Sequence, residues 1–145
     1  MTRVKSLALA LLALGVVAGT PCLAAEGPKP PAAAGRVFEL RTYYTHPGRL
    51  DALNTRFRDH TCKLFQKHGM ELIGFWTPTD DGQGKDDTLV YLLAYPSRDA
   101  AKASWKAFSS DPDWMKAKAE SEKDGPIVKK VESKYLEPTD YSAIK

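Results

Sequence analysis

Cysteine is scarce in this chain of 145 residues, and its scarcity limits how the fold can be stabilised. Only Cys22 and Cys62 are present. We expect Cys22 to be removed with an N-terminal signal, which would leave Cys62 unable to form an intrachain disulfide. The mature domain must then be held together by its hydrophobic core. Cys62 falls on the polar side of a predicted helix, with no activating group nearby in the sequence, and we interpret it as incidental.

The sequence signatures of several enzyme classes are also missing. There is no glycine-rich phosphate loop, no zinc-type spacing of cysteine and histidine, and no nucleophile elbow. Nucleotide-dependent and hydrolytic activities therefore have no support from local motifs, although a triad assembled from distant residues stays open. We assign no catalytic residue and no metal site.

Charge of one sign is not in excess either. The formal net charge is +3, and removal of Arg3 and Lys5 with the signal leaves +1. So small a charge gives no electrostatic basis for binding nucleic acid or an anionic membrane surface. We therefore predict no nucleic-acid partner.

The N-terminal residues 1–24 have the pattern of a secretory signal peptide. Arg3 and Lys5 precede the apolar run 7–18, and small residues around Ala24 favour cleavage before Ala25. An apolar run of about a dozen residues is too short to span a bilayer comfortably. An uncleaved anchor and a lipoprotein are the alternatives. We expect a periplasmic or secreted protein with no stable membrane association after cleavage.

Residues 25–35 form a linker rich in proline and alanine, and residues 36–142 form one domain. Hydrophobic periodicity in this domain predicts four strands and three helical segments. The strands are expected at 37–44, 70–77, 88–95 and 127–136, and the helices at 49–68, 97–108 and 112–121. The order β-α-β-β-α-β predicts an α+β, ferredoxin-like domain with its helices on one side of an antiparallel sheet.

The second and third strands are apolar on both faces, which a sheet facing water would not be. In the second strand Leu72, Gly74 and Trp76 alternate with Ile73 and Phe75. We therefore predict a homodimer in which a second copy covers the face that the helices leave open. The predicted interface residues are Ile73, Phe75, Val90 and Leu92.

Two histidines on the first predicted helix are candidates for chemistry. His60 and His68 lie eight residues apart, about 12 Å along a helix, so they cannot share one metal ion within a chain. Each can be a hydrogen-bonded structural imidazole, or one can serve as an acid–base group or haem ligand in a pocket between helix and sheet. The predicted ligand-binding residues are Arg41, Tyr43, His60, His68, Trp76 and Tyr91.

The first strand places Glu39 and Arg41 on the same side, two residues apart. We expect them to form an ion pair on the barrel-facing side, which would satisfy both charges on burial. The alternative is that Arg41 holds the carboxylate of a ligand. The aromatic residues of the domain are numerous enough to line a pocket or simply to fill the core.

Several linked motifs, in order, resemble the NIPSNAP family across 37–142. They are Phe38-Glu39-Leu40-Arg41-Thr42-Tyr43, Pro47-Gly48, His60-Thr61, His68-Gly69-Met70, Gly74-Phe75-Trp76, Leu89-Val90-Tyr91-Leu92-Leu93-Ala94-Tyr95, Asp111-Pro112-Asp113-Trp114 and the segment 136–142. The resemblance implies a dimeric α+β barrel, in which two ferredoxin-like sheets close into one barrel. It implies little about activity, because the family is poorly characterised. Its eukaryotic members are associated with mitochondria and vesicle traffic, a setting from which an exported chain departs.

Two functions follow as hypotheses. The first is an exported NIPSNAP-type dimer, without a cofactor, that binds a small, partly apolar molecule between helices and sheet. The alternative is a small monooxygenase-like or haem-handling enzyme that uses His60 or His68 together with Arg41. The alternative rests on analogy with more distant barrels of the same fold.

Overall fold

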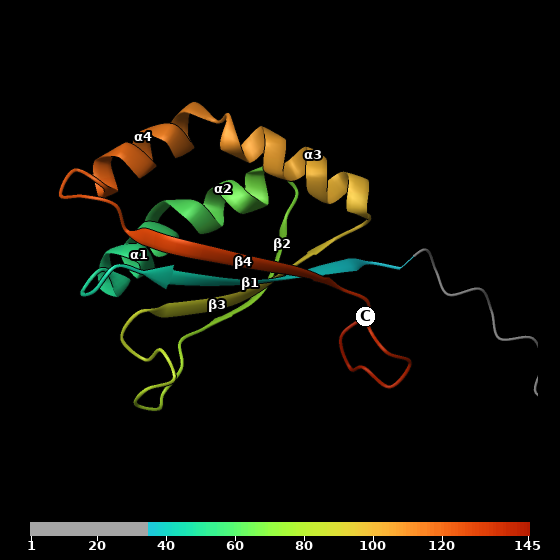
Figure 1. Ribbon diagram of the computed structural model, residues 1–145. Helices are drawn as coiled ribbons and strands as arrows, with labels where there is room; N and C mark the ends of the chain where they lie inside the picture. Colours follow the sequence, from blue (N-terminus) through green and yellow to red (C-terminus); the bar gives the residue numbers. More distant parts are fainter. Residues whose placement is uncertain (1–34) are drawn as a thin grey trace, which may run out of the picture. The chain divides into compact units, whose positions relative to one another are not determined.

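The computed structural model describes residues 35–145. The predicted signal peptide and the predicted linker up to residue 34 lie outside the described residues. The elements are β1 (Val37–Thr45), α1 (Leu50–Arg56), a π-helical segment η1 (Phe57–Thr61), α2 (Cys62–Lys67), β2 (Glu71–Trp76), β3 (Thr88–Tyr95), α3 (Arg98–Ser109), α4 (Pro112–Ser121) and β4 (Val128–Leu136). All the helical segments lie on one side of the sheet (Figure 1).

The four strands form one antiparallel sheet in the order β2-β3-β1-β4. The two interior strands are therefore β1 and β3, and β2 and β4 form the edges of the sheet. This order and the single helical layer confirm the predicted α+β, ferredoxin-like class. None of the helices within 35–145 is long and apolar enough to cross a membrane.

The hydrophobic core lies between the sheet and the helices. Along β3, every second side chain from Leu89 to Tyr95 is buried against the helical layer. The alternation follows from the two-residue period of a strand. The helices contribute the buried residues Leu50, Leu53, Phe57, Leu64, Phe65, Ala101 and Phe108.

The first predicted helix is one helical stretch, but its middle is wider than expected. The backbone N–H of Cys62 donates to the carbonyl of Phe57, and the Thr61 hydroxyl donates to the carbonyl of Arg56 at 3.2 Å. A π segment holds one residue more than an α-helical turn, so it rotates the residues that follow. Phe65 is thereby buried in the core, while His68 is only half-buried. One buried stripe from Leu50 to His68 was expected along this helix. It is confirmed as far as Leu64, and only its last member, His68, lies outside the core.

The second helical pair begins as the sequence predicts. The Ser97 hydroxyl accepts from the backbone N–H of Ala100, and a carboxylate oxygen of Asp111 accepts from the backbone N–H of Asp113 at 2.8 Å. Each contact satisfies an N–H that the first helical turn leaves unpaired. Proline at position 112, the first residue of α4, has no N–H to lose.

A β-bulge in β2 changes which of its side chains face the helices. The pairing with β3 shifts between Leu72 and Gly74, so Ile73 is the extra residue. Phe75 consequently lies opposite Tyr91, and their rings stack 5.4 Å apart on the helix side. The prediction of Phe75 as a dimer-interface residue was therefore wrong. It assumed strict alternation, which a one-residue insertion reverses.

The open face of the sheet carries the alternate side chains of β1 and β3, including Val90 and Leu92, as predicted. Trp76 also lies on this face, because it pairs with Val90. Its ring covers Gly74, whose added Cβ would lie 2.5 Å from the ring. The loop 77–87 and the C-terminal segment both project on this side, away from the helices (Figure 1).

Candidate functional site

A buried carboxylate occupies the helix-covered side of β1. Glu39 is 1% exposed, and both of its oxygens are fully used. One oxygen accepts from Arg41 at 2.7 Å and from the Ser133 hydroxyl at 2.6 Å, and the other accepts from the Tyr95 hydroxyl at 2.8 Å and the Trp105 indole N–H at 2.6 Å. Burial alone would raise the pKa of Glu39, but these four hydrogen bonds outweigh it and lower the pKa. Glu39 is therefore an anion that holds its neighbours in place.

The partner of this carboxylate is Arg41, two residues along the same strand. The predicted Glu39–Arg41 pair is present, but on the helix side rather than the barrel-facing side, because the two residues lie opposite Leu93 and Tyr91. The Trp105 ring stacks on the guanidinium with 4.1 Å from ring centre to Cζ. Burial by itself lowers the pKa of Arg41, but the nearby phenols of Tyr91 and Tyr43 and the Glu39 carboxylate raise it overall. Arg41 is therefore charged at every pH at which the protein folds.

Two phenols extend the cluster toward the core. Tyr91 is fully buried, and its ring centre lies 5.3 Å from that of Tyr43. Burial, and then the proximity of Tyr43, hold the pKa of Tyr91 well above its ordinary value, so its hydroxyl keeps its proton. That hydroxyl lies near Tyr43 and Arg41 but makes no hydrogen bond of good geometry, and neither does the buried Nε of Arg41. Unpaired buried donors are rare in folded proteins.

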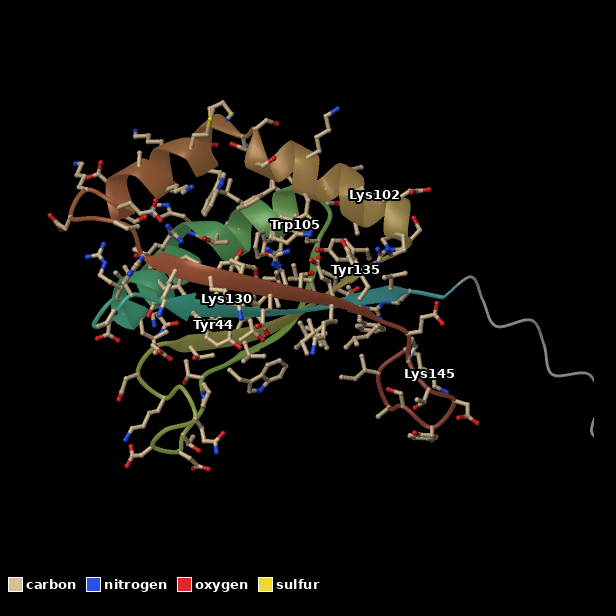
Figure 2. The ribbon with its side chains drawn as sticks, in the orientation of Figure 1. Tyr44, Lys102, Trp105, Lys130, Tyr135 and Lys145 are labelled. Atoms are coloured by element: carbon tan, nitrogen blue, oxygen red, sulfur yellow. The ribbon has the colours of Figure 1, made fainter. Side chains whose placement is uncertain are left out.

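The cluster reaches the surface along the edge strand β4. Val131 lies opposite Tyr43, and Ser133 lies opposite Arg41, so both face the helix side. Both are nevertheless exposed, Val131 by 42%. The helical layer thus leaves this stretch of β4 uncovered. Trp105, which comes from α3, lies between that helix and the sheet (Figure 2).

The structure brings together three of the six predicted ligand-binding residues. Arg41, Tyr43 and Tyr91 form one cluster, whereas Trp76 lies on the opposite face of the sheet and is 54% exposed. The prediction that Trp76 belongs to a pocket between helices and sheet was therefore wrong, because the bulge in β2 turns it to the open face.

His60 is also separate from this cluster. It is exposed and lines a shallow groove of about 280 Å³ between the first helical stretch and α4. The groove is lined by Ala52, Thr55, Arg56, His60, Ala117, Glu120 and Ser121. His60 therefore does not face the sheet, contrary to the expectation of a pocket residue.

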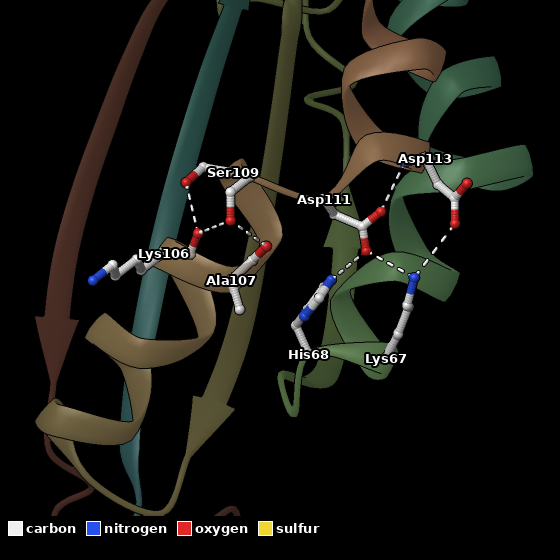
Figure 3. Close-up of polar contacts among 8 residues, drawn as sticks. Lys67, His68, Lys106, Ala107, Ser109, Asp111 and Asp113 are labelled. Atoms are coloured by element: carbon white, nitrogen blue, oxygen red, sulfur yellow. Dashed lines mark hydrogen bonds and ion pairs between the residues drawn. The ribbon is translucent and has the colours of Figure 1, made fainter.

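His68 lies at the C-terminal end of α2, where it joins two helices. Its Nε2 lies 2.6 Å from a carboxylate oxygen of Asp111, and Lys67 Nζ lies 2.8 Å from the same oxygen (Figure 3). Hydrogen bonds from Lys67 and His68 hold the pKa of Asp111 below its usual range. Asp111 caps α4 at the same time, so this contact is a structural link between α2 and α4. His68 is thus a hydrogen-bonded structural imidazole, the first of the two roles considered for it.

The haem-handling alternative has no ligand in the site. Neither His60 nor His68 points into the cluster around Arg41, and His68 Nε2 is already paired with Asp111. Within residues 35–145, no group of three or more His, Cys, Asp or Glu side chains could hold a metal ion. The site residues do not fit a haem. Cys62, expected on a polar surface, is half-buried against the core, and burial raises the pKa of its thiol.

Three functional residues were missed from the sequence. Glu39 was recognised as half of an ion pair but not as the acceptor of four side chains. Trp105 was considered only as one of the aromatic residues that could fill the core, and Ser133 was not singled out. Trp105 and Ser133 lie 66 and 94 residues from Glu39. Only the antiparallel register of β4 with β1 would have placed Ser133 beside Arg41.

These observations define an α+β protein of the ferredoxin-like class with a polar cluster between its sheet and its helices. The NIPSNAP family model matches residues 38–143. The chain belongs to the NIPSNAP family. No curated protein shows a significant match.

Solved structures of the same family are similar in fold. A NIPSNAP family protein of unknown function from Agrobacterium tumefaciens is 21% identical with a TM-score of 0.66, over 77% of this chain and 96% of that chain. A second protein from that organism is 20% identical with a TM-score of 0.65, over 76% and 99%. An uncharacterised NIPSNAP-like domain protein from Burkholderia xenovorans is 19% identical with a TM-score of 0.63, over 75% and 90%. At these identities the likeness concerns the fold alone.

Proposed function

We propose that this protein is an exported, homodimeric binding protein that holds a small, partly apolar molecule between its helices and its sheet. The observation that carries the proposal is the pair of buried, unpartnered donors, the Tyr91 hydroxyl and Arg41 Nε. A buried polar group without a partner costs about 1–3 kcal/mol, and a ligand that accepts from it would remove that cost. The ligand site consists of Arg41, Tyr43, Tyr91, Trp105 and Val131.

The environment of these donors suits an apolar, flat ligand. Phe57 and Phe75 pack against Tyr91 at ring-centre distances of 5.3 and 5.4 Å, and Tyr43 meets Phe57 edge to face. An aromatic wall with a few polar groups is the usual construction of a small-molecule site. The exposed side of Val131 extends this wall to the surface.

Dimerisation through the open face is supported by its side chains. Val90, Leu92 and Trp76 form an apolar area over β2 and β3. Charges on this face lie on the two edge strands: Lys130 and Glu132 of β4 form an ion pair of 2.6 Å, and Glu71 of β2 lies opposite Ala94. An area that is apolar at its centre and charged at its rim is typical of a protein interface. A second copy that covers this area closes the two sheets into an α+β barrel.

The binding proposal is tested by titrating the protein with planar aromatic compounds, namely 2-naphthol, 2-naphthoate and 2-naphthamide, followed by tryptophan fluorescence and calorimetry. We expect at least one of them to bind with one site per chain. Substitution Val131→Trp should abolish this binding, because a large ring at this position fills the opening on β4. The matched control His60→Ala, in the separate groove, should bind like the wild type. Binding that survives Val131→Trp would contradict the assignment of the site.

The exported location is tested independently of binding. The protein expressed with its full sequence should be recovered from the periplasm or the medium with an N-terminus at or close to Ala25. Recovery in the cytoplasm with Met1 intact would contradict export.

A further inference from the structure

We infer that the ligand carries a carboxylate attached to a planar apolar group, and that Arg41 and Tyr91 bind its two oxygens. The inference rests on the proposed function and names the chemical class of the ligand. It follows from which donors of the cluster are already used, which are free, and which edge of the guanidinium the free donors occupy.

The acceptors of the cluster are saturated. Each oxygen of Glu39 already accepts two hydrogen bonds, so the carboxylate cannot accept from a ligand or take a proton from it. Apart from Glu39, the polar groups here are the phenols, the guanidinium, and the Trp105 indole and Ser133 hydroxyl that already donate to Glu39. A ligand donor would find no strong acceptor here, so the cluster selects a molecule that accepts.

The free donors lie on one edge of the Arg41 guanidinium. Glu39 uses Nη1, at 2.7 Å, while Nη2 makes only a 3.5 Å contact with the Tyr43 hydroxyl and Nε has no partner. Nε and Nη2 share the edge of the planar group that binds both oxygens of a carboxylate side by side. The face of the guanidinium is covered by Trp105, so an incoming group meets this edge rather than the face.

The charge of Glu39 does not prevent a second carboxylate from binding. Its charge is offset by Arg41 Nη1 and by three further donors, from Tyr95, Trp105 and Ser133. The Tyr91 hydroxyl, held as a proton donor by burial, adds a neutral donor near Arg41 and Tyr43. The result is a donor-rich site in a low-dielectric environment, where a hydrogen bond to a charged oxygen is strong.

The apolar part of the ligand is expected to lie along Tyr43 and Val131. Tyr43 is half-buried, Val131 is exposed beside it, and Phe57 and Phe75 close the inner wall. A flat ring matches this wall better than a branched aliphatic chain does, because aromatic side chains pack edge to face or offset around planar groups. Aromatic monocarboxylates therefore fit both parts of the site.

The experiment compares 2-naphthoate with 2-naphthamide, which has the same shape but no charge, by calorimetric titration of the full mature domain. We expect wild-type protein to bind the acid at least about tenfold more tightly than the amide, since the Nε–Nη2 edge pairs with both oxygens of the acid only. Arg41→Lys keeps the positive charge but removes the two-donor edge, and should reduce the preference to below about threefold.

Tyr91→Phe separates a binding role from a structural one. The hydroxyl has no partner in the folded protein, so its removal should leave the unfolding temperature unchanged or higher, while binding of the acid weakens several-fold. Equal affinity for acid and amide in the wild type would overturn the inference and leave the proposed binding function standing. A preference that is unchanged in Tyr91→Phe and Arg41→Lys would also overturn it. Binding of neither compound would overturn both proposals.

Discussion

The two faces of the sheet differ in where their charged residues lie. On the helix-covered face, Glu39 and Arg41 are buried in the centre of the sheet, and the carboxylate is surrounded by four side-chain donors. On the open face, the centre is apolar, with Val90 and Leu92, and the charges lie on the edge strands β4 and β2.

This difference separates two tasks. A buried carboxylate with complete hydrogen bonding, such as Glu39, fixes the positions of its neighbours, because any displacement leaves a charged group unpaired. An apolar area with charges at its edge tolerates small displacements and gains free energy from being covered. The covered face is therefore suited to a site of fixed geometry, and the open face to association with a second copy.

The largest effect is expected for a substitution that removes the buried carboxylate of the covered face. Glu39→Ala leaves the charge of Arg41 buried without its carboxylate, so the free energy of unfolding should fall by about 3–5 kcal/mol, measured by urea denaturation. The matched control Glu71→Ala removes a carboxylate whose ion pair with Arg36 is exposed, and should change stability by less than about 1 kcal/mol. An unfolding midpoint for Glu39→Ala equal to that of the wild type would show that the cluster does not stabilise the fold.

The next largest effect is expected for a substitution that places a charge in the apolar area of the open face. Val90→Glu places a charge in the apolar area and should weaken the dimer by at least about 2 kcal/mol, roughly thirtyfold in its dissociation constant. The matched control is Val131→Glu, which places the same charge on the other face of the sheet and should leave the dimer intact. Sedimentation at micromolar concentration distinguishes the two. A wild-type protein that is monomeric at that concentration would refute the assignment of this face.

A smaller effect is expected when a buried hydroxyl is removed from the covered face, and its sign depends on whether that hydroxyl has a hydrogen-bond partner. Tyr91→Phe removes a buried hydroxyl that has no partner, so the unliganded protein should be as stable as the wild type or more stable by about 1 kcal/mol. Tyr95→Phe removes a hydroxyl that donates to Glu39 at 2.8 Å and should destabilise by about 1–2 kcal/mol. Thermal unfolding of the two variants side by side tests the contrast.

The smallest effect concerns pH. The pKa of Glu39 is lowered on folding from an ordinary value of 4.5, because the hydrogen bonds to its charged form outweigh burial. Its contribution to stability is therefore complete above about pH 4.5 and is lost as the pH falls toward the lowered pKa. The difference in unfolding free energy between wild type and Glu39→Gln should be constant from pH 6 to 8 and shrink below pH 4.5. A difference that grows on acidification would contradict this sign.

Much of the local structure could be predicted from the sequence. Ser97 and Asp111 mark the starts of two helices because their side chains accept from N–H groups two or three residues away, and β3 was placed at Thr88–Tyr95 because its apolar run lies between turn residues. The β-α-β-β-α-β order followed from these elements. Arg41, Tyr43 and Tyr91 were chosen as ligand residues from residue type and strand position, and the structure brings these three together.

Other features depended on the insertion of a single residue. The bulge at Ile73 exchanged the faces of Phe75 and Trp76, and after the π segment Phe65 is buried in the core beside the predicted Leu64. Each insertion changes the orientation of every later residue in its element. A pattern with a fixed period cannot show where such an insertion occurs.

The sequence by itself determined the type and order of the elements, the positions of the helix caps and the apolar character of both sheet faces, because these depend on residues near each other in the chain. Only the tertiary structure decided which face holds the Glu39–Arg41 pair, and that Trp105 and Ser133 complete it. Those contacts join residues 66 and 94 positions apart, and they exist only because the register of β1 with β4 and the packing of α3 bring their atoms together.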